Sequence, residues 1–229
     1  TSGMDLIFPH HENAIAISKA LTGKPLANYW LHNELVAVNS EETSGAAGDR
    51  TYTIRDLLEK GYSGREIRFW LISRHYRKPI SFAWSKLDTA KKTLANLDKF
   101  IKKLFAAPRG EDCPEMDQMV YNLRHNSVEA MDDDLNIAPA LAELFRFTRR
   151  VNRIMDQSGL SLADRDKVIR VLEEVNAVLC VMDLEPPKAD EKAEALIKER
   201  EQARKNKEWE RADRLRDDLL EMGIEVIDT

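Results

Sequence analysis

The chain has 229 residues, of which 43% are hydrophobic and 33% are charged, and its formal net charge is −5. This length can bury one good core and a smaller satellite, so two or three linked parts are expected. The acidic balance argues against a surface that coats DNA, because such binding requires a local excess of lysine and arginine. No apolar run approaches the roughly twenty residues of a membrane span and no charged-then-apolar leader opens the chain, so we expect a cytoplasmic protein with no membrane or DNA partner.

The two cysteines, Cys113 and Cys180, are far apart, and neither belongs to a C-x-x-C pair. Their spacing implies neither a disulfide framework nor a cysteine-based zinc site. Cys180 lies within the apolar run VLCVM, which predicts a buried residue.

The most specific stretch is GMDLIFPHHEN at residues 3–13. Its apolar residues, at positions 4–8, predict a short buried strand. Pro9 suits the first turn of a helix that ends at Gly23. A strand that delivers polar side chains to a helix start often lines a ligand pocket, although two histidines at a helix start are also common on a plain surface.

Helices dominate the sequence after an extended stretch at residues 25–38, in which a turn is expected at His32 and Asn33. Thr53 and Ser63 are predicted to cap two short helices. Further along, apolar residues at helical spacing predict four long helices that can bury a core of their own as a bundle. These four helices are expected at residues 84–107, 116–131, 138–155 and 164–182.

Two polar patterns in this bundle leave alternatives open. The acidic run at 132–134, with Asn136, predicts caps for the helix that starts near 138, and a divalent-metal site is the less favoured alternative. Four arginines form a stripe along the third bundle helix, namely Arg146, Arg149, Arg150 and Arg153. The stripe suits the backbone phosphates of a folded RNA, or it is a solvated face with acidic neighbours.

Pro186 and Pro187 break the chain and mark a linker. Beyond them, helices at 191–206 and 208–222 predict a helical hairpin. Trp209 is expected to be a core residue of this hairpin.

In order along nearly the whole chain lie GMDLIFPHHEN, NYWLHN, TIRDLLEKGYSGREIRFWLISRHYRKPISF and EAMDDDLNIAPAL. These motifs resemble the second half of a cysteinyl-tRNA synthetase, a class I aminoacyl-tRNA synthetase. The hairpin sequence KEREQARKNKEWERADRLRDDLLEMGIEV resembles the small domain with which that family recognises the cysteine anticodon. The implied family activity is the ATP-dependent ligation of cysteine to its tRNA, with a bound zinc ion.

The resemblance implies a mainly α fold, in which the end of a Rossmann-type catalytic domain is followed by an α-helical bundle and a small C-terminal helical hairpin domain. The expected parts are a catalytic-domain remnant at 1–52, a connecting helical unit at 53–83, a tRNA-binding type of bundle at 84–185 and an anticodon-binding-like domain at 188–229.

The resemblance also assigns site residues. A substrate- and nucleotide-binding pocket is matched by Gly3, Asp5, His11 and His32. His10 matches a zinc ligand, but a second ligand position falls on Ala14 and the family's two ligand cysteines have no counterpart. Because one imidazole remains where zinc takes four ligands, we expect this chain to bind no zinc and no other cofactor.

The mobile KMSKS loop of the family aligns with Glu42, Thr43, Ser44, Gly45 and Ala46. Both lysines, which stabilise the charge that develops on pyrophosphate, are lost, and one position has become an acid. Removing a single contact of this kind typically costs about a hundredfold or more in rate. The chain alone is therefore predicted to be inactive, and no catalytic residue is assigned.

Candidate tRNA-binding cations lie in three places. They are Arg74, Arg77 and Lys78 in the connecting unit, the four arginines of the stripe, and Arg204, Lys205 and Arg211 in the hairpin. Three interpretations follow: a tRNA-binding remnant that is inactive alone, one part of a split synthetase completed by a protein partner with the Rossmann half, or a non-catalytic helical scaffold that binds another protein.

Overall fold

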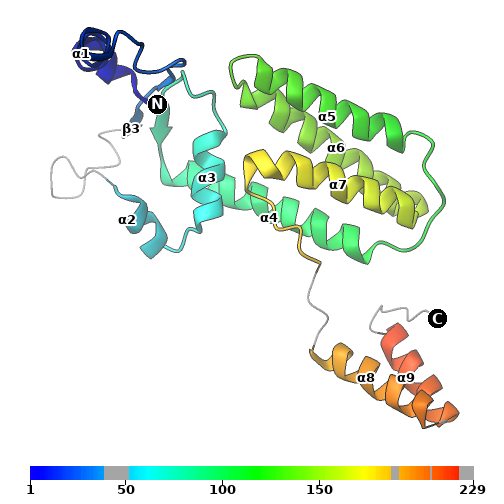
Figure 1. The fold of residues 1–229 in the computed structure, drawn as a ribbon. Helices are drawn as coiled ribbons and strands as arrows, with labels where there is room; N and C mark the ends of the chain where they lie inside the picture. Colours follow the sequence, from blue (N-terminus) through cyan, green and yellow to red (C-terminus); the bar gives the residue numbers. More distant parts are fainter. Residues whose placement is uncertain (39–51, 187–190, 207, 222–229) are drawn as a thin grey trace.

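The computed structural model describes residues 1–38, 52–186, 191–206 and 208–221, and these residues form a mainly α structure (Figure 1). The first part contains α1 (Glu12–Thr22), the connecting part contains α2 (Ile54–Glu59) and α3 (Gly64–Ile72), and a hairpin of α8 (Glu191–Lys205) and α9 (Trp209–Glu221) comes last. The bundle consists of α4 (Trp84–Ala106), α5 (Met116–Asp132), α6 (Ile137–Ser158) and α7 (Leu162–Leu179). The expected fold class is confirmed.

Side-chain caps set the starts of several helices, as predicted. The hydroxyl of Thr53 accepts a hydrogen bond from the backbone N–H of Asp56, and the Asp56 carboxylate accepts one from the Thr53 backbone, so α2 starts with a capping box. Ser63 and Glu66 do the same for α3. At the other end of α1, Gly23 has the left-handed φ of 69° that is common where a helix stops.

One strand prediction and one turn prediction for the first part of the chain are wrong. Residues 4–8 form no strand but two short helical segments, η1 (Met4–Leu6) and η2 (Ile7–His11), because a short apolar run cannot by itself separate a strand from a helix. The turn expected at residues 32 and 33 is instead the strand β2 (His32–Asn33).

The short strands of the first part form two parallel pairs. β1 (Ser2–Gly3) pairs with β2, and β3 (Val36–Val38) pairs with β4 (Ile80–Phe82), which directly precedes α4. In the β3–β4 pair, Val36 lies opposite Ile80. This pairing joins the first part of the chain to the bundle.

One hydrophobic core runs from α2 through α7. Apolar residues at the predicted spacing point inward, and several are fully buried: Leu87, Leu104, Met116, Leu123, Leu144, Val151, Val168 and Leu172. The ring of Phe82 contacts those of Trp70 and Trp84 edge to face where α3 and β4 meet α4. Within the described ranges, no helix combines the length and apolar composition that crossing a membrane requires.

Two arginines of α3 tie this helix to the end of α7. Arg68 Nε donates to the Leu179 carbonyl at 2.5 Å, and Arg65 donates from Nε and Nη2 to the Val181 carbonyl at 2.9 and 2.7 Å. Carbonyls at a helix C-terminus have no partner inside the helix, so these bonds satisfy groups that would otherwise be orphaned. Cys180 adopts φ 53° between the two carbonyls and is exposed, so its predicted burial is wrong.

Replacing Leu172 by alanine should destabilise the bundle by about 2–5 kcal/mol, because the side chain is fully buried and the truncation leaves a cavity. Leu162→Ala, on the same helix but 49% exposed, is the matched control and should change stability far less. Urea unfolding followed by circular dichroism measures both, and equal losses would show that the bundle core is not packed as described.

Candidate functional site

Two predicted site histidines meet at the start of the chain. His11 Nδ1 lies 2.9 Å from His32 Nε2, so one ring nitrogen donates a hydrogen bond to the other. The Trp30 ring stacks parallel to that of His32 at a centroid distance of 6.0 Å, and the Ser2 hydroxyl lies 3.4 Å from His11 Nδ1. The β1–β2 pairing brings the two histidines together, although they are 21 residues apart.

Gly3 lies opposite Asn33 in the β1–β2 pair, and Asp5 follows two residues later. A Cβ on Gly3 would come within 2.2 Å of the Asp5 carboxylate, so only glycine allows the carboxylate its position. His10 is exposed, and among the described residues no three His, Cys, Asp or Glu side chains are grouped to hold a metal ion. The donor set present here does not fit zinc. The loop at residues 42–46 lies outside the described residues.

Asp134 forms a polar cluster on the surface with Tyr76 and Arg77. Its carboxylate accepts hydrogen bonds from Tyr76 Oη at 2.6 Å and from Arg77 Nε and Nη2 at 2.6 and 3.2 Å. The guanidinium of Arg77 also lies over the Tyr76 ring, 5.3 Å from its centroid. These contacts tie the turn after α3 to the loop between α5 and α6.

The predicted capping role of the acidic run is wrong for this carboxylate. Asn136 is the N-cap of α6 and makes no side-chain capping hydrogen bond, while Asp134 turns its oxygens towards the α3 side. Asp134 and Leu135 both have left-handed φ, at 53° and 56°, and this backbone conformation directs the Asp134 carboxylate towards the α3 side. Sequence alone gave no signal for this contact, because its partners lie 57 and 58 residues away.

The same contacts shift three pKa values. The hydrogen bond from Arg77, with a smaller contribution from Tyr76, holds the pKa of Asp134 below its ordinary value. The hydrogen bond to Asp134 raises the pKa of Tyr76 and also that of Arg77. The cluster therefore stays a charged pair with a neutral phenol at neutral pH.

Two of the four arginines of the stripe on α6 have acidic partners. Arg150 Nη2 lies 2.5 Å from a Glu115 carboxylate oxygen, and Arg146 pairs with Glu143 one turn earlier. Arg149 and Arg153 are exposed and have no ion pair or side-chain hydrogen bond within the described part of the chain. The stripe is thus partly neutralised, with two cations left to meet an external anion.

The hairpin presents a tryptophan to solvent. Trp209, the first residue of α9, is 58% exposed, so its predicted place in the core is wrong; Ala203, Ala212, Leu215 and Leu219 are buried instead. Arg211 pairs with Glu208 at 3.3 Å and with Glu199 at 3.8 Å, and Lys205 is exposed. Arg204 is half-buried and also makes a polar or ring contact, so it is not a free cation.

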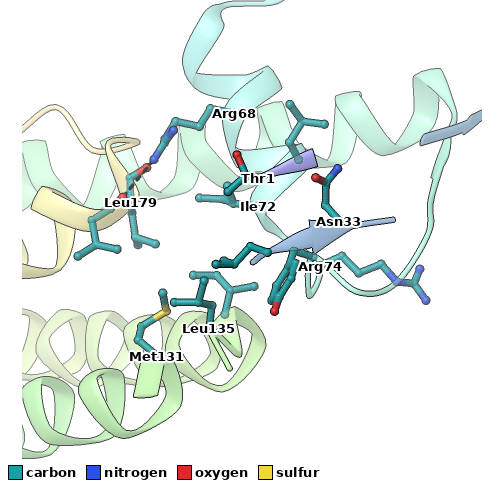
Figure 2. Close-up of a pocket in the computed structure, with 13 residues that line it drawn as sticks. Thr1, Asn33, Arg68, Ile72, Arg74, Met131, Leu135 and Leu179 are labelled. Carbon is teal, nitrogen blue, oxygen red and sulfur yellow. Dashed lines mark hydrogen bonds between the residues drawn. The ribbon is translucent and has the colours of Figure 1, made fainter. Parts of the chain in front are cut away.

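An apolar groove separates α3 from the α5–α6 junction and the end of α7 (Figure 2). Its volume is about 380 Å³, and its walls include Ile72, Met131, Leu135 and Leu179. In Figure 2 the Arg74 side chain extends away from these apolar residues. Arg74 and Lys78 are exposed beyond the end of α3.

Comparisons with known proteins give concordant matches along the chain. The family model described as the tRNA synthetases class I (C) catalytic domain matches residues 1–92. The DALR domain matches residues 128–183, and the cysteinyl-tRNA ligase anticodon binding domain matches residues 186–229.

Curated relatives named cysteine-tRNA ligase match almost the whole chain. One from Chlamydia muridarum is 37% identical over 236 residues, covering 99% of this chain and 50% of the relative. Those from Thermodesulfovibrio yellowstonii and Oenococcus oeni are each 38% identical, covering 97% and 99% of this chain and 50% and 49% of the relative. The chain spans about half the length of the curated relatives it matches.

Asp134→Asn should destabilise the chain at pH 7, because the amide keeps the left-handed backbone but removes the charge that pairs with Arg77. The folded pKa of Asp134 lies below the ordinary 3.8, so its contribution is complete above about pH 4 and is lost as the pH falls through the folded pKa. The difference in urea midpoint between wild type and variant should therefore shrink between pH 5 and pH 3. Asp133→Asn, which removes a neighbouring charge without a side-chain partner in the described residues, is the control, and an equal effect would contradict the assignment.

Proposed function

Because the chain belongs to the cysteinyl-tRNA synthetase family, and corresponds to its C-terminal portion, we propose that it binds tRNA and does not activate cysteine on its own. In this proposal residues 1–52 are a catalytic-domain remnant and 53–83 connect it to the bundle. The bundle at 84–185 and the hairpin at 188–229 carry the RNA contacts.

The exposed Trp209 is the observation that carries the proposal. Because the indole is 58% exposed, its burial contributes little to the stability of the small hairpin. On RNA-binding surfaces, such exposed aromatic rings contribute binding free energy by stacking on unpaired bases, such as those of an anticodon loop. The match of this segment to an anticodon-binding domain supports the same assignment.

The outer face of α6 supplies the matching electrostatic surface. Arg149 and Arg153 carry charges that no described acidic side chain neutralises, and their side chains lie on the face opposite the buried Val151 and Met155. Arginine on a rigid helix suits phosphate oxygens, because its planar fork donates two hydrogen bonds in fixed geometry. The chain can thus bind RNA through local basic sites despite its net charge of −5.

A second candidate function is that of one part of a split synthetase. Parallel strands normally occur with both faces covered, yet β1–β2 and β3–β4 are two-stranded pairs in a part of the chain with many exposed apolar side chains. On and near α1, Ile17 is 59%, Leu21 80% and Tyr29 86% exposed. A polypeptide with a Rossmann-type sheet has the chemistry to cover this face.

The tRNA proposal is tested by titrating the pure chain against cysteine tRNA and an unrelated tRNA at two salt concentrations. We expect tighter binding of cysteine tRNA, weakened by salt, and a loss of affinity of about tenfold in Trp209→Ala, since one stacked base contributes about 1–3 kcal/mol. Tyr121→Ala, which removes an exposed aromatic ring from α5, is the matched control and should bind as wild type. Absence of binding to either tRNA would refute the proposal.

The split-synthetase alternative is tested by cysteine-dependent ATP–pyrophosphate exchange. The chain alone should show none, and adding the Rossmann half of a relative should restore none, because Glu42 stands where the loop needs a lysine. The double variant Glu42→Lys, Gly45→Lys with the same half should show exchange about a hundredfold or more above the background of the assay. Robust exchange by the wild-type chain with that half would instead favour the split-synthetase function.

A further inference from the structure

We propose that the cavity between the turn after α3 and the first turn of α6 is a subsite for one backbone phosphate of a folded RNA, with Arg74 and Lys78 as its binding cations. The cavity has a volume of about 490 Å³. This is enough for a phosphate with part of its ribose. The inference rests on the proposed tRNA binding and adds a specific contact point to it.

The lining of the cavity is cationic. Arg74, His75, Arg77 and Lys78 line one side, Asn136 and Ala138 line the other, and no acidic side chain is among the described residues that line it. Arg74 and Lys78 have no ion pair or side-chain hydrogen bond with any described residue. Two free cations beside one cavity repel each other, and an anion between them removes that cost.

The position of these cations is fixed by their neighbours. Arg77, between them in sequence, is held by two hydrogen bonds to Asp134, and its backbone N–H donates to His75 Nδ1 at 3.2 Å. The backbone N–H of Lys78 donates to the His75 carbonyl at 2.9 Å. The turn is therefore ordered before any ligand arrives, which lowers the entropy cost of binding.

A phosphate of RNA fits this site better than a carboxylate of a protein. The site offers the guanidinium of Arg74 and the ammonium of Lys78, which suit phosphate oxygens, and the Arg74 side chain, which also lines the apolar groove, extends away from the apolar residues of that groove (Figure 2). Contacts of this type position a nucleic acid without reading its sequence. The subsite thus sets the placement of the RNA, and discrimination between tRNAs is left to other contacts.

The test compares the double variant Arg74→Ala, Lys78→Ala with the matched control Lys92→Ala, Lys99→Ala. The control removes two exposed lysines of α4 that have no ion pair or side-chain hydrogen bond with any described residue. The first double variant should bind cysteine tRNA about tenfold more weakly at 0.1 M salt, and its log–log salt slope should fall by about one per lost contact. In an ethylation-interference assay, the variant should lose one phosphate position at which ethylation blocks binding, and the other positions should remain. Equal losses of tRNA affinity in both double variants, or an unchanged ethylation-interference pattern, would overturn the subsite.

A second measurement separates this inference from the proposed function. Titration of the wild-type chain with inorganic phosphate should shift the amide resonances of Lys78 and Ala138 in a saturable way, and the Arg74→Ala, Lys78→Ala variant should lose these shifts. If tRNA binds but phosphate produces no shift there, the subsite is wrong and the proposed function stands. If phosphate shifts these amides while no tRNA binds, the site exists and the proposed function fails.

Discussion

The arrangement of the surface depends on the hydrogen bonds between two arginines of α3 and the carbonyls at the end of α7. Arg65 and Arg68 donate to Val181 and Leu179, where the C-terminal end of the helix is both unsatisfied and partly negative. A single contact of this kind is modest, but the two arginines span one turn of α3 and so fix its rotation as well as its position. The turn that carries Arg74 and Lys78 follows directly after the helix held in this way.

Asp134 completes the attachment at the other end of the same segment. The arginines hold α3 on α7, while Tyr76 and Arg77 hold the following turn on the loop before α6. The left-handed backbone of Asp134 and Leu135 costs energy for residues with side chains, and such strain persists only where surrounding contacts over-determine it. Strain at this loop therefore agrees with a surface that is kept in one conformation for binding.

The sequence predicted most helices closely because caps and apolar spacing are local signals, as Thr53, Ser63 and Gly23 illustrate. It failed where the outcome depends on distant partners. The sequence predicts a capping role for Asp134 at the start of the next helix, because it cannot show that Arg77 lies within reach of the carboxylate. Trp209 was placed in the core because hydrophobic character predicts burial, whereas Ala203 and Leu219 fill the hairpin and leave the indole outside. Residues 4–8 read as a strand in the sequence because no pattern separates a short apolar strand from a short apolar helix.

Amino-acid activation and RNA binding, the two functions of the family, have separate physical requirements. The histidine pair needs only the β1–β2 contact, so His11 and His32 keep a 2.9 Å hydrogen bond although residues 1–38 include no fully buried side chain. Activation of an amino acid needs more, because cations must meet a charge that appears only in the transition state, and the aligned loop positions hold Glu42 and Gly45 instead. Binding to RNA needs only fixed cations and an exposed aromatic ring. The bundle provides the cations and the hairpin provides the ring, and each of these parts has buried apolar residues of its own. In the proposed function, the two requirements are therefore separable, because the aligned loop positions are distinct from the residues proposed to hold a tRNA.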